Sequence, residues 1–346
     1  MSDTYGPDSQ LLWGLILAAG DGRRLQRYVQ QCKGEELPKQ YVNFVGQRSM
    51  LEHTFQRVER LIPPHQILTI IGSHHLAYSE VRRQLSSRPE QTIIVQPENK
   101  ETGPGIFLPL MFLYKRCPEA TVALFPSDHF ILEEDRFMNH IRLAAQVVRH
   151  DPTRIILLAI EAQQPETDYG YILPGDAIAR SGGFGTRKVL GFVEKPEADL
   201  AVELMLAGGL WNTMTMVFKV KTLLDLVRRV YPAVYLNFCR ILEAIGTPDE
   251  QATIHDVYEL LEPMNFSKGV LERIADGYPE SVSVLPVRQV YWSDWGCGQR
   301  IRQDLRTLRH FEHQETLQKQ KLTVVSSNKG GGKSLGALFT AQHRIS

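Results

Sequence analysis

Short apolar runs alternate with helix-like segments from residue 15 to residue 160, and this alternation limits the fold more than any other feature. The apolar runs lie at 15–19, 67–71, 92–95, 122–125 and 155–160. Segments with helical spacing separate them, at about 50–61, 76–85, 106–114 and 136–149. Strands that are apolar throughout are buried on both faces, and strands joined through helices run parallel. The pattern predicts an α/β fold: a Rossmann-like, mostly parallel sheet flanked by helices.

The helix expected at about 50–61 has a clear start and stop. Ser49 and Glu52 match a capping box, with Ser49 as the N-cap and Glu52 at the third helical position. Pro63 and Pro64 end the segment.

The second half of the chain has a different pattern, in which strands carry charged ends. We expect strands at 169–172, 189–196, 216–220 and 283–287, and helices at about 199–207, 223–230, 234–245 and 255–261. No internal repeat is found before residue 300.

Three of the first strands end in polar loops, at Gly20, Gln96 and Asp128. Ligands of open α/β sheets bind at the carboxyl ends of the strands. These loops should therefore converge on one cleft.

The first of these loops reads Gly20-Asp21-Gly22-Arg23-Arg24, and Lys39 follows 15 positions after Arg24. Glycine lets the backbone approach a ligand closely, and arginine and lysine supply positive charge for phosphate. The loop is either a polyphosphate-binding loop or an ordinary turn with solvated arginines. A short Gly-x-Gly does not decide between them.

Composition excludes several classes of protein. The formal net charge is zero, so no basic field indicates a nucleic-acid partner. The four cysteines are widely spaced without a C-x-x-C pair, which argues against a zinc site or a redox motif and favours a reducing cytoplasm. Residues 1–10 do not resemble a secretory leader, and no apolar run approaches the ~20 residues of a membrane span.

The tail from residue 299 is basic, with nine Lys or Arg against three Asp or Glu. Its charge suits a solvated or subunit-facing helix better than contact with an anionic partner. The segment 324–334 suggests a phosphate loop, but Ser327 stands where that pattern requires glycine. We expect a flexible terminal segment there.

Seven motifs follow one another along the chain: Leu17-Ala18-Ala19-Gly20-Asp21-Gly22-Arg23-Arg24-Leu25, Pro38-Lys39-Gln40, Gln96-Pro97-Glu98-Asn99, Phe125-Pro126-Ser127-Asp128-His129, Tyr169-Gly170-Tyr171-Ile172, Phe192-Val193-Glu194-Lys195-Pro196 and Trp211-Asn212. In this order they resemble the sugar-1-phosphate nucleotidyltransferase family, and within it the mannose-1-phosphate guanylyltransferases. The resemblance covers roughly residues 12–300, which we expect to form the catalytic domain, with 301–346 as a basic tail.

The resemblance implies a magnesium-dependent reaction of an NTP, expected to be GTP, with a sugar 1-phosphate, expected to be mannose 1-phosphate. The products would be an NDP-sugar and pyrophosphate. The attacking phosphate oxygen is already anionic at pH 7, so catalysis needs alignment and charge neutralisation rather than a base. A glucose-1-phosphate uridylyl- or thymidylyltransferase and a non-catalytic nucleotide-sugar-binding homologue stay open as alternatives.

The resemblance also implies a role for individual residues. Phosphate-binding, catalytic roles go to Arg24, Lys39 and Lys195. The nucleotide would contact Ala19, Gly20, Gly22 and Gln96. The sugar would contact Gly170, Glu194 and Asn212. Asp128 and Asp294 would bind Mg²⁺ through their carboxylates.

Each of these residues also has an ordinary structural interpretation. Asp128 could cap a helix, Asp294 could serve a turn, and Glu194 with Lys195 could be a surface ion pair. Arg23 either adds a phosphate contact or points to solvent, and His129 is expected to be structural.

The sequence departs from the family at the sugar side. Met214 stands where the family has glycine, Ser267 replaces an aspartate, and Lys100-Glu101 replaces an arginine-led pair. We therefore expect the sugar pocket to be altered while the phosphate side is intact. Whether the chain forms a homodimer through its tail stays open.

Overall fold

A computed structural model describes residues 11–34, 36–178, 184–306 and 308. The chain divides into two units, residues 1–296 and 297–346. Of the second unit the structure describes a helical segment at 298–306. Most of the basic tail, including the segment 324–334, lies outside the described residues.

The first unit is built on a nine-stranded sheet. Its strands lie in the order β3 (Ile93–Gln96), β2 (Ile67–Gly72), β1 (Leu12–Leu17), β4 (Thr121–Pro126), β9 (Leu210–Lys219), β6 (Ile155–Glu161), β10 (Val282–Val287), β8 (Arg187–Glu194) and β7 (Gly170–Ala177). The strands β3, β2, β1 and β4 are parallel, and so are β6 and β10. Only β9 and β8 run against them. The prediction of an α/β fold with a mostly parallel sheet is confirmed.

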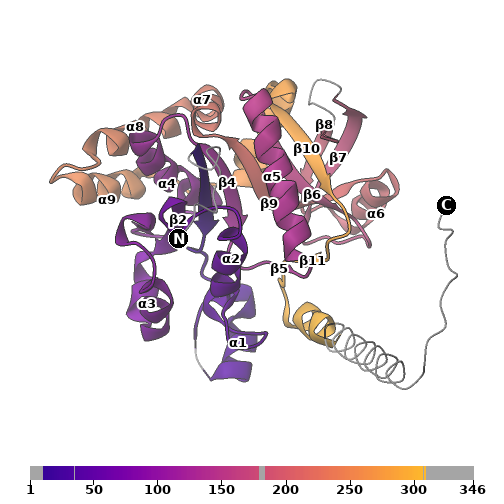
Figure 1. The fold of residues 1–346 in the computed structure, drawn as a ribbon, viewed down its shortest axis with the longest axis horizontal. Helices are drawn as coiled ribbons and strands as arrows, with labels where there is room; N and C mark the ends of the chain where they lie inside the picture. Colours follow the sequence, from indigo (N-terminus) through magenta and orange to yellow (C-terminus); the bar gives the residue numbers. More distant parts are fainter. Residues whose placement is uncertain (1–10, 35, 179–183, 307, 309–346) are drawn as a thin grey trace, which may run out of the picture. The chain divides into compact units, whose positions relative to one another are not determined.

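Helices cover both faces of this sheet (Figure 1). The helices described in the first unit are α1 (Gln26–Lys33), α2 (Met50–Val58), α3 (Ser79–Leu85), α4 (Thr102–Arg116), α5 (Glu134–His150), α6 (Ala198–Leu206), α7 (Val220–Val230), α8 (Pro232–Ala244), α9 (Glu250–Leu260) and α10 (Glu272–Gly277), and not all of them lie on the sheet. Successive strand residues point to opposite faces, so Leu15 joins the core under α4, α7 and α8 while Ile16 is buried on the other side. None of the helices within the described ranges is both long and apolar enough for a membrane span.

The predicted capping box at the start of α2 is confirmed. Ser49 Oγ accepts the backbone N–H of Glu52 at 3.1 Å, and Glu52 Oε2 accepts the backbone N–H of Ser49 at 2.8 Å. Helix α2 packs on η3 (Lys39–Tyr41), the turn that carries Lys39.

Two parts of the sheet region differ from the sequence-based expectation. Strand β9 begins at Leu210 rather than near Met216, because Leu210 and Trp211 already pair with both β6 and β7. A second, two-stranded sheet joins β5 (Phe130–Ile131) to β11 (Trp292–Ser293), with Ser293 opposite Phe130. This small sheet was not expected, since a two-residue strand carries no periodic pattern.

Candidate active site

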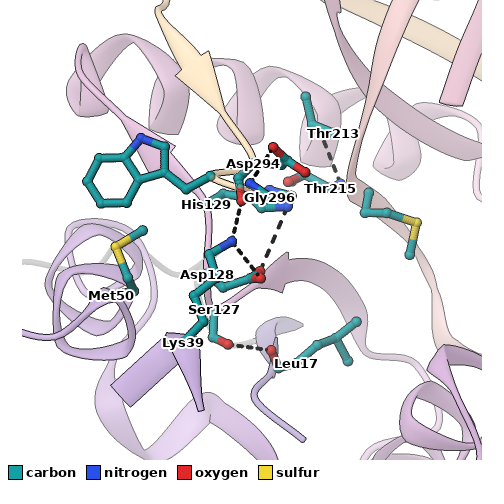
Figure 2. Close-up of polar contacts among 12 residues, drawn as sticks. Leu17, Lys39, Met50, Ser127, Asp128, His129, Thr213, Thr215, Asp294 and Gly296 are labelled. Atoms are coloured by element: carbon teal, nitrogen blue, oxygen red, sulfur yellow. Dashed lines mark hydrogen bonds and ion pairs between the residues drawn. The ribbon is translucent and has the colours of Figure 1, made fainter. Parts of the chain in front are cut away.

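Three loops meet beyond the carboxyl ends of β1 and β4 (Figure 2). Ser127 links the ends of β1 and β4, because its hydroxyl donates a hydrogen bond to the Leu17 carbonyl at 2.6 Å. Asp128 follows directly. The pairing of β5 with β11 brings Asp294 to the same place from the far end of the domain.

Lys39 lies between these two aspartates. Its Nζ is 3.0 Å from Asp128 Oδ2 and also donates to the backbone carbonyl of Asp294. The Lys39 residue is only 5% exposed, whereas the Asp128 side chain is 38% exposed. A buried ammonium ion therefore depends on the oxygen atoms of both aspartates (Figure 2).

The charge states around Asp128 follow from this arrangement. Burial is the strongest single influence on the pKa of Asp128 and opposes its ionisation, but several opposing interactions, of which the positive charge of Lys39 is the largest, together hold the pKa of the carboxyl below its ordinary value. Burial lowers the pKa of His129 to about 4, so its imidazole is neutral at pH 7. The indole N–H of Trp292 donates to His129 Nδ1 at 3.2 Å, which fits the structural role expected for this histidine.

The carboxylate of Asp294 is held in a fixed orientation. Its Oδ1 accepts the hydroxyl of Tyr169 at 3.0 Å and the backbone N–H of Gly296 at 2.8 Å. Tyr169 was part of a quoted motif, but no pattern in the sequence indicated this contact.

The donor atoms at this point fit a hard divalent cation. Carboxylate oxygens of Asp128 and Asp294 are the ligands that Mg²⁺ takes in proteins, together with phosphate oxygens and water. The Lys39 ammonium ion contacts one carboxylate oxygen of Asp128 and the backbone carbonyl oxygen of Asp294, so a positive charge is already bound at this point.

A cavity of about 200 Å³ opens beside the first loop. Three of the four residues expected to contact the nucleotide line it: Ala19, Gly20 and Gln96. Gln96 is buried, and the Tyr258 hydroxyl donates to its Oε1 at 3.4 Å. The far wall includes Glu101, whose φ of 65° and ψ of −166° lie in a region that non-glycine residues rarely occupy.

Gly22, the fourth predicted nucleotide contact, is not among the residues that line this cavity, and it lies against the turn that carries Lys39. Its φ is +62°, and a Cβ atom there would lie 2.9 Å from the backbone nitrogen of Lys39. Glycine at this position therefore allows the Lys39 turn to pack against the loop.

Gln40 was missed as a functional residue, although it stands in a quoted motif. Its side-chain amide donates to the carbonyls of Ala18 and Gly20, at 2.9 and 2.8 Å. These bonds set the path of the loop that lines the cavity.

The two arginines of the loop lie in solvent. The Arg24 side chain is 62% exposed, and its Nη1 is 3.6 Å from Asp168 Oδ1. Arg23 is 85% exposed and 3.3 Å from Asp21 Oδ2. Asp168 precedes Tyr169, so Arg24 borders the site without entering it.

The residues expected to contact the sugar lie together. A Cβ atom on Gly170 would be 2.5 Å from Glu194 Oε2 and 3.5 Å from the Cβ of Asn212. Burial raises the pKa of Glu194, while the neighbouring Lys195 lowers it by less. The exposed Lys195 has a φ of 50°, and its backbone N–H donates to the Tyr169 carbonyl at 3.2 Å.

The two residues that depart from the family at the sugar side touch each other. Met214 Sδ is 2.8 Å from the hydroxyl of Ser267, which lies in the π-helical turn η7 (Phe266–Leu271). Met214 has a φ of 55°, a conformation that favours glycine, and its backbone N–H donates to Asn212 Oδ1 at 3.0 Å. The backbone thus keeps a glycine-like conformation while the side chain adds bulk beside Asn212.

Comparison with known proteins agrees with this geometry. The family model described as nucleotidyl transferase matches residues 13–303. The xanthan biosynthesis protein XanB of Xanthomonas campestris pv. campestris (strain B100) is 28% identical over 285 residues, which cover 82% of this chain and 57% of that protein. A mannose-1-phosphate guanylyltransferase of Klebsiella pneumoniae is 28% identical over 292 residues, covering 83% and 58%. The chain therefore spans little more than half the length of these relatives.

The fold is also shared with solved structures. The crystal structure of mannose-1-phosphate geranyltransferase from Thermus thermophilus superposes with a TM-score of 0.69 at 24% identity, covering 83% of this chain and 76% of that one. At this identity the likeness concerns the fold alone.

Proposed function

The chain belongs to the nucleotidyl transferase family, and from this premise we propose that it transfers a nucleotidyl group from an NTP to a sugar 1-phosphate. GTP and mannose 1-phosphate are the proposed substrates, on the strength of the relatives' names. The products are GDP-mannose and pyrophosphate. Residues 12–300 are proposed as the catalytic domain, and the cytoplasm as the location, which the four free cysteines support.

One observation carries the proposal. The ammonium ion of Lys39 is held between Asp128 and Asp294, next to the cavity lined by Ala19, Gly20 and Gln96. Such a site combines a cation, two carboxylates and an apolar-walled pocket for a base. Those are the parts that nucleotidyl transfer requires, since its barrier is dominated by repulsion between phosphates.

The reaction is an in-line displacement at the α-phosphorus of the nucleotide. A phosphate oxygen of the sugar 1-phosphate forms the new P–O bond, and the bond from the α-phosphorus to the bridging oxygen breaks, so that pyrophosphate leaves. No proton is transferred, because the attacking oxygen is already ionised at pH 7.

Residues of the chain supply alignment and charge. Lys39 neutralises the α-phosphate region, and Arg24 at the border of the site attracts the departing pyrophosphate. Lys195 binds the phosphate of the sugar, while Glu194 and Asn212 accept and donate hydrogen bonds to its hydroxyl groups. Asp128 and Asp294 would hold Mg²⁺, which when bound offsets the negative charge of the triphosphate.

The test is pyrophosphate release by the purified full chain with Mg²⁺, measured for GTP, UTP and dTTP, each paired with mannose 1-phosphate and with glucose 1-phosphate. The highest turnover is expected with GTP and mannose 1-phosphate. Turnover with a different pair would refute the substrate assignment alone. GDP-mannose binding without pyrophosphate release from any pair would refute the catalytic proposal and favour a binding protein.

A further inference from the structure

A second group of metal-binding side chains lies beyond β1 and β2, apart from Asp128 and Asp294. Asp21 comes from the first loop, and His74 and His75 come from the helical turn η5 (Ser73–Ala77) that follows β2. Asp21 Oδ1 is 3.0 Å from His74 Nε2 and 3.9 Å from His75 Nε2. One ligand atom from each residue lies within 4.8 Å of the others.

The protonation of His75 follows from its hydrogen bonds. The Tyr41 hydroxyl has one hydrogen, which it donates to the Ala18 carbonyl at 3.0 Å. It can therefore only accept from His75 Nδ1, which lies 3.2 Å away. Nδ1 thus carries the proton, and Nε2 carries a lone pair.

That lone pair is buried and unused. His75 is 0% exposed, and within the described residues its Nε2 has no hydrogen-bond partner. A neutral nitrogen lone pair therefore faces the carboxylate of Asp21, an arrangement that a cation between them would satisfy.

We propose that Asp21, His74 and His75 bind a divalent transition-metal ion of the zinc class. Zinc lies about 2.0–2.2 Å from imidazole nitrogen and carboxylate oxygen, so ligand atoms of a tetrahedral site are separated by about 3.3 Å. The observed separations from Asp21 Oδ1, 3.0 and 3.9 Å, lie on either side of that value. Tyr41 then acts as the outer partner that fixes the orientation of a metal-binding histidine.

The site differs in chemistry from the one proposed for Mg²⁺. Two imidazole nitrogens favour zinc or a similar ion, whereas magnesium prefers oxygen ligands only. The widely spaced cysteines argue against a thiolate site, and this site contains none. His74 is half-exposed, so the ion can enter from solvent and a water molecule can take the fourth position.

An ordinary ion pair between His74 and Asp21 explains fewer of these contacts than a bound metal ion does. It accounts for the distance of 3.0 Å but leaves His75 Nε2 without a partner among the described residues. Metal binding accounts for all three side chains. It would also fasten Asp21, between Gly20 and Gly22, to the end of β2 and so restrain the loop that lines the cavity.

The experiment is calorimetric titration of ZnCl₂ into the chelator-treated full chain, without nucleotide or sugar, so that its result is independent of the proposed reaction. Binding of Co²⁺ is followed in parallel by its visible absorption, which reports tetrahedral coordination. The test variants are Asp21→Asn and His74→Gln, because both side chains reach solvent and their loss should leave folding intact. The matched control is His255→Gln, in the fully exposed cluster of His255, Asp256 and Glu259 on α9.

One zinc ion per chain is expected to bind, with excess Mg²⁺ failing to displace it. Asp21→Asn and His74→Gln should each weaken binding at least about 100-fold, since loss of an outer partner of a metal ligand already costs about 10–100-fold, and should abolish the cobalt absorption. His255→Gln should bind as the wild type does. Absence of binding would overturn the proposal, and so would unchanged affinity in both test variants, which would assign the ion to exposed thiols such as Cys32.

Discussion

Replacing Asp128 with asparagine tests the central pair of the site. The substitution keeps the shape of the side chain and removes its charge. Lys39 would then be a buried cation that faces only neutral oxygen atoms at these two contacts, the new amide oxygen and the backbone carbonyl of Asp294. Asp128→Asn should therefore destabilise the protein and also abolish turnover.

The size of the effect on stability follows from burial. Breaking a fully buried ion pair costs about 3–5 kcal/mol, whereas an exposed pair contributes about 0–1 kcal/mol. Lys39 is buried, but the Asp128 side chain is 38% exposed and solvent screens its charge. We expect a loss of about 2 kcal/mol, between these limits.

A double-mutant cycle separates stability from catalysis. Lys39→Met removes the buried charge itself and leaves a carboxylate that is 38% exposed and can be hydrated, so it should cost less than Asp128→Asn. The double variant should be about as stable as Lys39→Met alone, because asparagine no longer faces an unpaired ammonium ion. Turnover should nevertheless fall at least about 100-fold in all three variants.

Urea unfolding in the presence of a chelator measures the stabilities, and pyrophosphate release with Mg²⁺ measures turnover. Removal of Mg²⁺ from the wild type should abolish turnover as well. Two results would refute the reasoning. Equal stability of Asp128→Asn and the wild type would show that Lys39 does not depend on Asp128. Retained turnover in Asp128→Asn would contradict its role in binding the metal.

Three further variants test the sugar side. Lys195→Ala should raise the KM for the sugar 1-phosphate at least about tenfold, since a charge-assisted hydrogen bond contributes about 1.5–3 kcal/mol, with kcat nearly unchanged. The exposed Lys188 on β8 supplies the control, and an equal change in Lys188→Ala would contradict the role of Lys195. Met214→Val should be about 1–2 kcal/mol less stable than Met214→Gly in thermal or urea unfolding, because a β-branched residue is strained at a φ of 55°; equal stabilities would count against the left-handed conformation. Because burial raises the pKa of Glu194, its folded form binds a proton more readily than its unfolded form, and its charge lowers stability at pH 7. Glu194→Gln should therefore raise the unfolding free energy at pH 7, but not below the ordinary pKa of a glutamate, while it weakens sugar binding; no gain at pH 7 would disprove this sign.

The sequence by itself determined the layered architecture. Runs such as Leu15 to Ala19 are apolar at every position, so both faces of the strand must be covered, and the intervening helical segments supply the cover. The start of α2 was determined in the same local way, because the capping box acts over four consecutive residues. The apolar run and the capping box each lie within a few consecutive residues. The run is recognised from the burial of its own side chains, and the box from hydrogen bonds between neighbouring residues.

Motif order also indicated much of the site. The resemblance named Ala19, Gly20 and Gln96 together, and they line one cavity. It named Gly170, Glu194 and Asn212 together, and they adjoin one another. It did not indicate the amide bonds of Gln40, which depend on how η3 packs against the first loop.

Only the tertiary structure decided which distant groups touch. The pairing of β5 with β11 brings Asp294 to Lys39, although two-residue strands carry no period that sequence reasoning could detect. Met214 meets Ser267, and Asp21 meets the histidines after β2, by the same kind of long-range packing. Local patterns reflect burial within one helix or strand, whereas these contacts arise from the packing of whole elements and leave no pattern in any single segment.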